Sequence, residues 1–187
     1  MADRPTTLLD GGMGQELRKR TRAPATPLWS AQVMRDEPDL VAAVHRDYIA
    51  AGADVITANT YVATPQRLAR DGTRLRSGEP LAEAASAVVD AGADAVLINC
   101  SAPEAVTTAM PLLADRGVPF GGYANGFEAA DRLEAGGTVD ALAAREGMTP
   151  AVYAGHVQAW TEAGATMVGG CCEIGPAHIA ELQRRFG

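Results

Sequence analysis

All three cysteines of the chain follow short segments that are typical of buried strands. Cys100 comes directly after the apolar run 95–99, and Cys171 and Cys172 come directly after 167–170. In parallel α/β proteins the carboxyl ends of the strands meet at one edge of the sheet, where ligand sites lie. Three thiolates with one open position can hold a catalytic zinc ion, which keeps a bound thiol deprotonated at neutral pH. The sequence therefore predicts a zinc site made of Cys100, Cys171 and Cys172.

Other uses of these cysteines lead to different predictions. A buried cysteine is often a small apolar packing residue. A disulfide between Cys171 and Cys172 would need a strained ring, because neighbouring Cα atoms are only about 3.8 Å apart. Three is an odd number of cysteines, which argues against a disulfide framework. A thiol redox protein that uses the Cys171–Cys172 pair stays as an alternative, and it predicts reversible oxidation without a bound metal.

A glycine-rich turn, residues 10–14, closes the first expected strand. Its glycines let the backbone approach a ligand closely, so their N–H groups can bind a carboxylate while Asp10 binds an ammonium group. The same pattern also fits a simple tight turn. Polar side chains follow other expected strands as well and can reach the same edge. The predicted substrate contacts are Asp10, Gly11, Gly12, Asn59, Tyr61 and Asn125.

A repeated helix–glycine–strand pattern positions these residues. Three stretches begin with Ala-Gly-Ala, at residues 51, 91 and 163, and each runs into a short apolar segment. Glycine ends a helix readily in the left-handed conformation, and short apolar runs indicate buried parallel strands. The pattern predicts a parallel α/β fold, with a loop after residue 11 and another over 125–147. The expected strands are 8–11, 55–59, 95–99, 119–123 and 167–170, and the expected helices are 38–51, 65–70, 81–91, 103–116, 150–163 and 176–186.

Composition and charge narrow the class of protein. The 187 residues are 47% hydrophobic and contain no apolar run long enough to span a membrane. The amino-terminal residues lack the pattern of a secretion signal, so we expect one cytoplasmic domain over residues 1–187. The net charge is −7, and the one basic cluster, residues 18–22, is interpreted as a solvated helix end or loop. No nucleic-acid partner is expected.

The motifs together resemble the homocysteine S-methyltransferase family. This resemblance implies a zinc-dependent barrel enzyme that moves a methyl group onto a thiol such as homocysteine, giving methionine. It implies zinc on the three cysteines, and contacts from Asp10 and the following glycines to the amino-acid part of the substrate. The methyl donor would be a sulfonium or ammonium compound, with S-adenosylmethionine, S-methylmethionine, a betaine and a corrinoid-bound methyl all open. The matching segments are 9–14, 27–30, 45–48, 59–61, 98–101 and 169–172, followed by Pro176 and His178.

The chain departs from the family's pattern in several places. Residues 64–70 follow the second expected strand, and residues 71–80 already resemble the segment before the family's sixth strand. Strands three to five are therefore expected to be absent, together with an acidic residue after strand four that helps hold the substrate ammonium. Glu173 stands where the family has a glycine after the cysteine pair. The family's Asn-x-Gly-Glu turn appears as residues 125–128 with the sequence Asn-Gly-Phe-Glu.

About five βα units are too few for an eight-stranded barrel, which averages about 250 residues, and periodicity alone also allows an open doubly wound sheet. A truncated barrel would expose two sheet edges and an apolar interior. We therefore expect a homo-oligomer, most simply a dimer whose partner covers the gap. The function predicted first is a zinc-dependent S-methyltransferase that acts on a small-molecule thiol and a methyl donor. A non-catalytic relative that binds zinc or a thiol is the main alternative.

Overall fold

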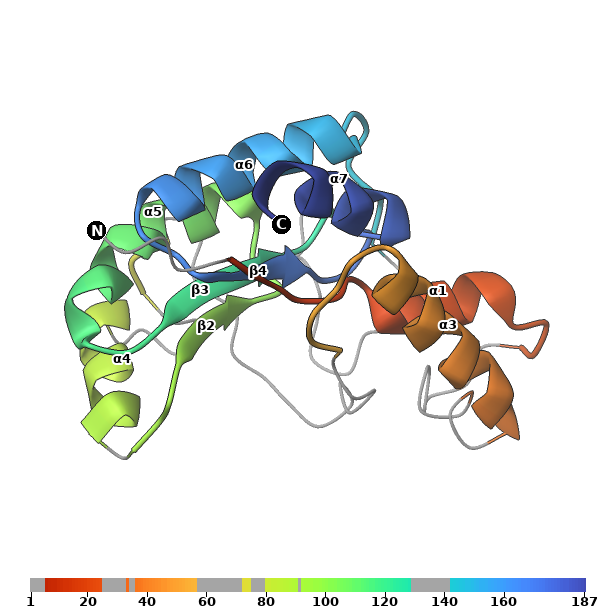
Figure 1. The fold of residues 1–187 in the computed structure, drawn as a ribbon, viewed down its shortest axis with the longest axis horizontal. Helices are drawn as coiled ribbons and strands as arrows, with labels where there is room; N and C mark the ends of the chain where they lie inside the picture. The colour runs from red at the N-terminus through yellow and green to blue at the C-terminus, as the bar shows by residue number, and fades with distance from the viewer. Residues whose placement is uncertain are drawn as a thin grey trace.

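The computed structural model describes residues 6–24, 33, 36–56, 72–74, 80–90, 92–128 and 142–187. Within these ranges four parallel strands form one sheet, in the order β1-β4-β3-β2 (Figure 1). The first strand therefore lies beside the last. An isolated parallel bridge between Leu9 and Val55 extends the sheet beyond β1. The strands are β1 (Thr7–Leu8), β2 (Val96–Asn99), β3 (Phe120–Ala124) and β4 (Met167–Gly170).

The strand order favours a barrel-derived sheet over a doubly wound one. From β2 the sheet runs through β3 and β4 to β1, and Val55, from the second expected strand, pairs on the far side. In a βα barrel the last strand likewise closes against the first. The helices α5 (Pro103–Leu113), α6 (Pro150–Glu162) and α7 (Pro176–Phe186) all lie on one face of the sheet (Figure 1). A doubly wound sheet carries helices on both faces, so the predicted parallel, barrel-type α/β class is confirmed.

Apart from α1, the described helices begin and end close to where the sequence predicts, and the expected helix 65–70 lies outside the described residues. The helix α3 (Pro38–Ala50) and the helices α5, α6 and α7 each begin with proline, which needs no hydrogen-bond partner at the first position. The helix α4 (Leu81–Asp90) precedes β2, and a short 3-10 turn, η2 (Ala114–Arg116), extends α5. No helix in the described ranges is long and apolar enough to cross a bilayer. The glycines that follow helices have positive φ angles, as expected: Gly52, Gly92, Gly117 and Gly164.

The helix α1 (Met13–Arg20) lies where the sequence predicts a loop. Glycines at positions 11, 12 and 14 hide its beginning, because glycine lowers helix propensity. Met13 and Leu17, one helical turn apart, are both buried and attach α1 to the core. The predicted strand 8–11 is correspondingly shorter, since only Thr7–Leu8 and the bridge at Leu9 have strand geometry.

The basic cluster at residues 18–22 lies at the carboxyl end of α1, and two of its side chains are paired with acidic ones. Lys19 Nζ lies 3.2 Å from Glu173 Oε2, and Arg20 lies 2.9 Å from Glu16 and also contacts Asp47. Basic residues in the last turn of a helix also interact favourably with its dipole. These contacts confirm the interpretation of the cluster as a helix end.

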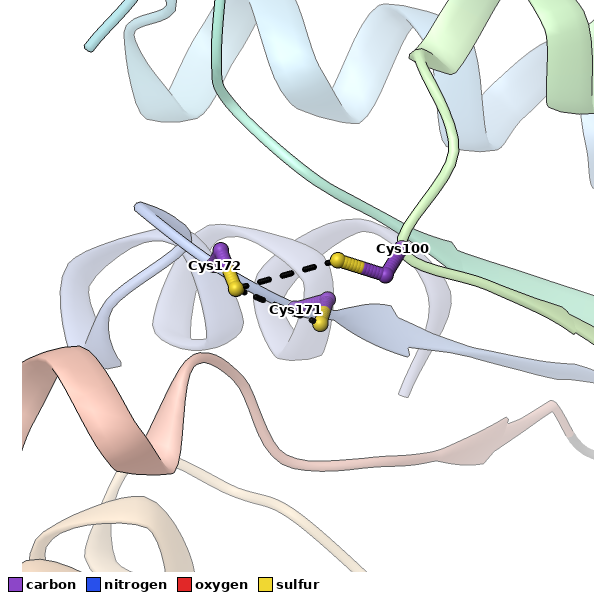
Figure 2. Close-up of side chains that lie close together, drawn as sticks. All are labelled: Cys100, Cys171 and Cys172. Atoms are coloured by element: carbon purple, nitrogen blue, oxygen red, sulfur yellow. Dashed lines mark hydrogen bonds between the residues drawn. The ribbon is translucent and has the colours of Figure 1, made fainter. Parts of the chain in front are cut away.

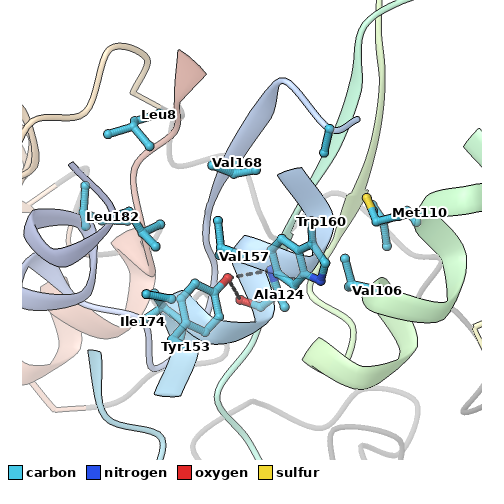
Figure 3. Close-up of a cluster of buried hydrophobic side chains, with 14 of the residues drawn as sticks. Leu8, Val106, Met110, Ala124, Tyr153, Val157, Trp160, Val168, Ile174 and Leu182 are labelled. Carbon is cyan, nitrogen blue, oxygen red and sulfur yellow. Dashed lines mark hydrogen bonds between the residues drawn. The ribbon is translucent and has the colours of Figure 1, made fainter. Parts of the chain in front are cut away.

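The main core lies between the sheet and α5, α6 and α7 (Figure 3). Trp160 and Tyr153 of α6 are fully buried, with their rings edge to face and 5.9 Å apart. Trp160 Nε1 donates to Thr107 Oγ1 of α5 at 2.8 Å. The Tyr153 hydroxyl accepts from the Ala124 N–H at 3.0 Å and donates to the Gly169 carbonyl at 2.6 Å. Tyr153 therefore fixes the ends of β3 and β4, and the cysteine pair follows β4 directly.

Candidate metal centre

The three cysteines meet at the carboxyl edge of the sheet (Figure 2). Cys100 follows β2, and Cys171 and Cys172 follow β4. The Cys172 Sγ lies 3.7 Å from the Cys100 Sγ and 3.8 Å from the Cys171 Sγ. All three sulfur atoms lie within 4.8 Å of one another. The structure therefore brings together the three residues that the sequence predicts to share a site.

The separations of these sulfur atoms suit a tetrahedral metal ion. Two Zn–S bonds of about 2.3 Å at a tetrahedral angle place their sulfur atoms about 3.8 Å apart. A disulfide would need an S–S distance of about 2.05 Å, and all three cysteines are free thiols. Three donors also leave a fourth position open, as in catalytic rather than structural zinc sites. The donor set therefore fits a metal ion with room for one further ligand.

Cys100 and burial raise the pKa values of both Cys171 and Cys172. Hydrogen bonds with Cys100 and Cys172, together with burial, raise the pKa of Cys171 well above its usual value. The hydrogen bond with Cys100 is also the main cause that raises the pKa of Cys172. A divalent cation would reverse this balance, because an opposite charge nearby favours the thiolate form. The cluster thus has the chemistry of a cation site.

The turn at Cys100 has an unusual backbone and is held by Asn125. Cys100 has a φ of 53°, a left-handed conformation that residues other than glycine rarely adopt. The fully buried Asn125 donates from Nδ2 to the Cys100 carbonyl at 2.7 Å and accepts at Oδ1 from the Phe127 N–H at 3.1 Å. Asn125 therefore orients the first thiol of the site. Its direct contact with a substrate, which the sequence predicts, stays a prediction.

The turn after the cysteine pair is also left-handed. Glu173 has a φ of 63°, which glycine adopts without a steric penalty and other residues do not. This geometry explains why a glycine belongs at this position in the pattern that the chain resembles. The ion pair between Glu173 and Lys19 joins this turn to α1.

The Asp10 turn packs directly against the cysteine loop. Asp10 is 1% exposed, and its carbonyl accepts from the Gly170 N–H at 2.9 Å. A Cβ atom on Gly11 would lie 2.0 Å from the Ile174 carbonyl oxygen, and one on Gly12 would lie 2.6 Å from the Cys171 carbonyl oxygen. The two glycines are therefore needed for this close packing.

The glycine N–H groups are not equally available to a ligand. The Gly12 N–H donates to the Ile174 carbonyl at 2.9 Å, so it is already used within the chain. The carboxylate contact predicted for Gly12 would have to replace this hydrogen bond. The ligand contacts of Asp10 and Gly11 stay predictions.

Two residues near the thiols were not predicted from the sequence. Burial, followed by the charges of Cys171 and Asp10, raises the pKa of Tyr123, so its phenol lies near both groups. The sequence feature that could have revealed Tyr123 is its place near the end of β3, where it pairs with Asn99 of β2. Gln15 of α1 is buried and acts against the effect of Cys100 on the pKa of Cys172, so its side chain also lies near that thiol. The glycines that hid α1 hid this residue as well.

Two of the predicted substrate residues, Asn59 and Tyr61, lie outside the described residues. The three histidines of the chain, His45, His156 and His178, all lie in helices. Of these, His178 has a structural role, because its Nδ1 accepts from the Gly175 N–H at 3.3 Å and its Nε2 lies 2.9 Å from the Met148 carbonyl. The thiols therefore supply the donor set without a histidine.

Comparison with known proteins places these features in context. The family model described as Homocysteine S-methyltransferase matches residues 7–74 and 68–186. The homocysteine S-methyltransferase of Escherichia coli (strain K12) is 45% identical over 65 residues, which are 35% of this chain and 21% of that protein. The selenocysteine Se-methyltransferase of Brassica oleracea var. italica is 38% identical over 74 residues, 40% of this chain and 21% of that protein. The chain thus matches about a fifth of the length of these relatives.

Solved structures share the fold. The metallated form of the homocysteine methyltransferase MmuM from Escherichia coli superposes with a TM-score of 0.70, at 20% identity, over 98% of this chain and 97% of that chain. The oxidised form of the same protein gives a TM-score of 0.72, at 22% identity, over 96% of each chain. The sheet and helices described above are therefore similar to those of MmuM.

Proposed function

The chain belongs to the homocysteine S-methyltransferase family, and we propose that it is a zinc-dependent S-methyltransferase acting on homocysteine or a similar thiol. The observation that carries this proposal is the cluster of Cys100, Cys171 and Cys172 at the carboxyl edge of the sheet. The names of the relatives support it, since they describe methyl transfer involving homocysteine or selenocysteine.

The proposed chemistry joins a thiolate to an activated methyl group. A zinc ion held by the three cysteines would keep the substrate thiol deprotonated at neutral pH. The substrate sulfur then forms a bond to the methyl carbon while the bond from that carbon to the donor's sulfonium sulfur or ammonium nitrogen breaks. The donor leaves as a neutral thioether or amine, and the thiol proton has already passed to solvent. No general base is required.

The contribution of the protein is to bind and position the substrate. Asn125 fixes the Cys100 turn, and Tyr153 fixes the strand that leads to Cys171 and Cys172. Asp10, buried in the adjoining turn, would receive the substrate ammonium group. Holding two reactants in line can by itself supply about 7–11 kcal/mol of a reaction barrier.

A methyl-transfer assay tests the proposal. Zinc-loaded protein is mixed with homocysteine and, separately, with S-adenosylmethionine, S-methylmethionine or betaine, and methionine is measured by mass spectrometry. We expect methionine with at least one donor, and none with the Cys172→Ser variant. A protein that binds zinc and homocysteine yet makes no methionine with any donor would contradict methyl transfer.

A non-catalytic zinc- or thiol-binding protein is the second candidate. The two segments matched by the family model meet at residues 68–74, where the sequence predicts strands three to five to be absent. A chain that keeps the thiol cluster but lacks part of the substrate pocket would bind zinc or a thiol without transferring a methyl group. A thiol redox protein, the third candidate, would contain no metal.

We also propose that the chain works as a homo-oligomer, most simply a dimer. Among the described residues β2 pairs only with β3, and at the other end of the sheet Val55 and Ile56 are 43% and 41% exposed. A second copy that covers these edges would bury them. Light scattering at micromolar concentration should give about twice the chain mass of 19.4 kDa, and a uniform monomer would contradict the proposal.

A further inference from the structure

An apolar cluster covers part of the metal centre, and the proposed chemistry makes no use of it. Phe127, in the turn after β3, is 3% exposed and packs against Cys100 and Cys172. Leu142 is half-buried and packs against the same cluster. Cys100 and Cys172 are themselves buried, whereas Cys171 is partly exposed. Phe127 and Leu142, here called the apolar cover, therefore close the side of the centre where the two buried thiols lie.

Backbone contacts hold the apolar cover in place. The Phe127 N–H donates to Asn125 Oδ1 at 3.1 Å. Phe127 also pairs with Ala144 in an isolated antiparallel bridge, and the backbone hydrogen bonds beside this bridge are 2.8 and 3.2 Å long. The pairing fixes the segment 142–145 against the turn 125–128, so both members of the cover have a defined position beside the thiols.

The side chain at position 127 sets this chain apart from the pattern that it resembles. The third residue of the family's Asn-x-Gly-Glu turn is glycine, and here it is Phe127. Of the described residues other than glycine, only Cys100 and Glu173 have a positive φ angle, so the backbone at Phe127 carries no strain of that kind. The ring therefore adds a wall beside the thiols where a glycine would leave space.

A ring in contact with two thiols limits the size of the ligands that can reach them. Packed protein interiors leave few voids larger than a water molecule, so a bulky group must displace the ring before it reaches either sulfur. A steric clash of this kind is one way in which a site rejects one ligand in favour of another. The ring and the leucine side chain offer only apolar atoms, which suit the methylene chain of a thiol. The apolar cover thus favours slim, flexible ligands over bulky ones.

We propose that Phe127 is a specificity-determining residue, which together with Leu142 restricts the metal centre to slim ligands such as a small aliphatic thiol. The contacts that carry this proposal are those of Phe127 with Cys100 and Cys172. The inference rests on the proposed function only in taking the three cysteines as the place where a ligand binds.

Cysteine labelling tests the proposal, because all three cysteines of the chain belong to the cluster. N-methylmaleimide and N-(1-pyrenyl)maleimide carry the same reactive group on substituents of very different size. The full chain is reduced and treated with a chelator, so that no metal ion protects the thiols. The labelling rate at Cys100, which is 2% exposed, is measured by peptide mass spectrometry and divided by the rate of the same reagent with glutathione.

For the unmodified chain we expect this normalised rate to be at least about tenfold lower with the pyrenyl reagent than with the methyl reagent, since the larger group needs a larger local opening. Phe127→Ala should raise the pyrenyl rate by at least about tenfold and the methyl rate by less than about threefold, because the truncation makes room beside the sulfur. Phe127→Leu keeps a large apolar side chain, so its rates should stay closer to those of the unmodified chain than to those of Phe127→Ala.

The matched control is Phe120→Ala. Phe120 is 6% exposed and belongs to the main core, at the amino end of β3 and therefore away from the carboxyl edge. This variant loses the same side chain from a similarly buried position, so it shows what a general loss of stability does to labelling. General opening exposes the thiols to both reagents alike, so the ratio of the two rates should stay within about twofold of that in the unmodified chain.

Three results would overturn the role of Phe127 while leaving the proposed function intact. The first is an unmodified chain that does not discriminate between the reagents, and the second is a Phe127→Ala chain whose two rates are unchanged or rise equally. The third is a Phe120→Ala chain whose ratio changes as much as that of Phe127→Ala. Labelling requires neither zinc nor methyl transfer, so a chain that discriminates by size but makes no methionine would contradict the proposed function and leave this inference standing.

Discussion

The face of the sheet that α5, α6 and α7 cover, here called the covered face, differs from the carboxyl edge of the sheet. The difference lies in how completely their polar groups have partners within the chain. On the covered face Trp160 is fully buried (Figure 3), and its ring nitrogen donates to Thr107. At the edge, thiols with raised pKa values lie together, Cys100 has a left-handed backbone, and the Gln15 Oε1 lacks a partner in the described residues. Strain and unpaired groups of this kind concentrate at functional sites. The polar groups of Trp160 and Tyr153 are paired within the chain, whereas the edge carries thiols and a buried oxygen that a bound ligand would satisfy.

Truncating the core of the covered face gives the largest expected loss of stability. Trp160→Ala should lower the free energy of unfolding by about 3–5 kcal/mol, because it leaves a cavity and removes the Thr107 contact. Urea denaturation should show the same loss with and without zinc, since Trp160 contacts Tyr153 and Thr107 rather than the cysteines. Val152→Ala on the same helix, where Val152 is 48% exposed, should change stability by less than about 0.5 kcal/mol. Recovery of the lost stability by zinc would break the distinction between the two regions.

A change at Asn125 should affect both stability and metal binding. Asn125→Ala leaves the Cys100 carbonyl and the Phe127 N–H without their partner, so the free energy of unfolding should fall by about 1–3 kcal/mol. Zinc affinity should fall as well, because the Cys100 turn loses its support. Asn99→Ala, at the exposed end of β2, is the control and should change neither quantity. An Asn125→Ala chain that is less stable but keeps its full zinc affinity would show that Asn125 does not orient the thiol.

The smallest expected effect concerns the backbone at Glu173. Glu173→Gly relieves the left-handed conformation, and Glu173→Ala keeps it, while both remove the ion pair with Lys19. The glycine variant should therefore be more stable than the alanine variant by about 1 kcal/mol in thermal or urea unfolding. Equal stabilities would contradict the presence of strain at this turn.

The sequence predicted what depends on local signals. Proline marks where the helices at Pro38 and Pro176 begin, and glycine marks where helices end. Both residues can be recognised because they act through their own backbone. The thiol cluster followed from the rule that parallel strands end at one edge, which places Cys100 beside Cys171 although they are far apart in the chain. These features need no knowledge of how side chains pack.

The features that were missed depend on distant partners. The glycines around Met13 concealed α1, which packing against the core stabilises, and Gln15 could not be placed without that helix. The support that Asn125 gives to Cys100 depends on the shapes of two turns on neighbouring strands. A polar residue after a strand indicates a site, but the sequence does not show whether it contacts a ligand or the residues that hold one.

The zinc content of protein purified under reducing conditions tests the account most directly. Cys172→Ser is prepared beside it, since Cys172 lies between the other two thiols. We expect about one zinc ion per chain in the unmodified protein, as for a single three-thiolate site, and none in the variant. Absence of zinc from the unmodified protein, even after zinc is supplied, would contradict a metal centre at these cysteines and leave thiol redox chemistry to explain them.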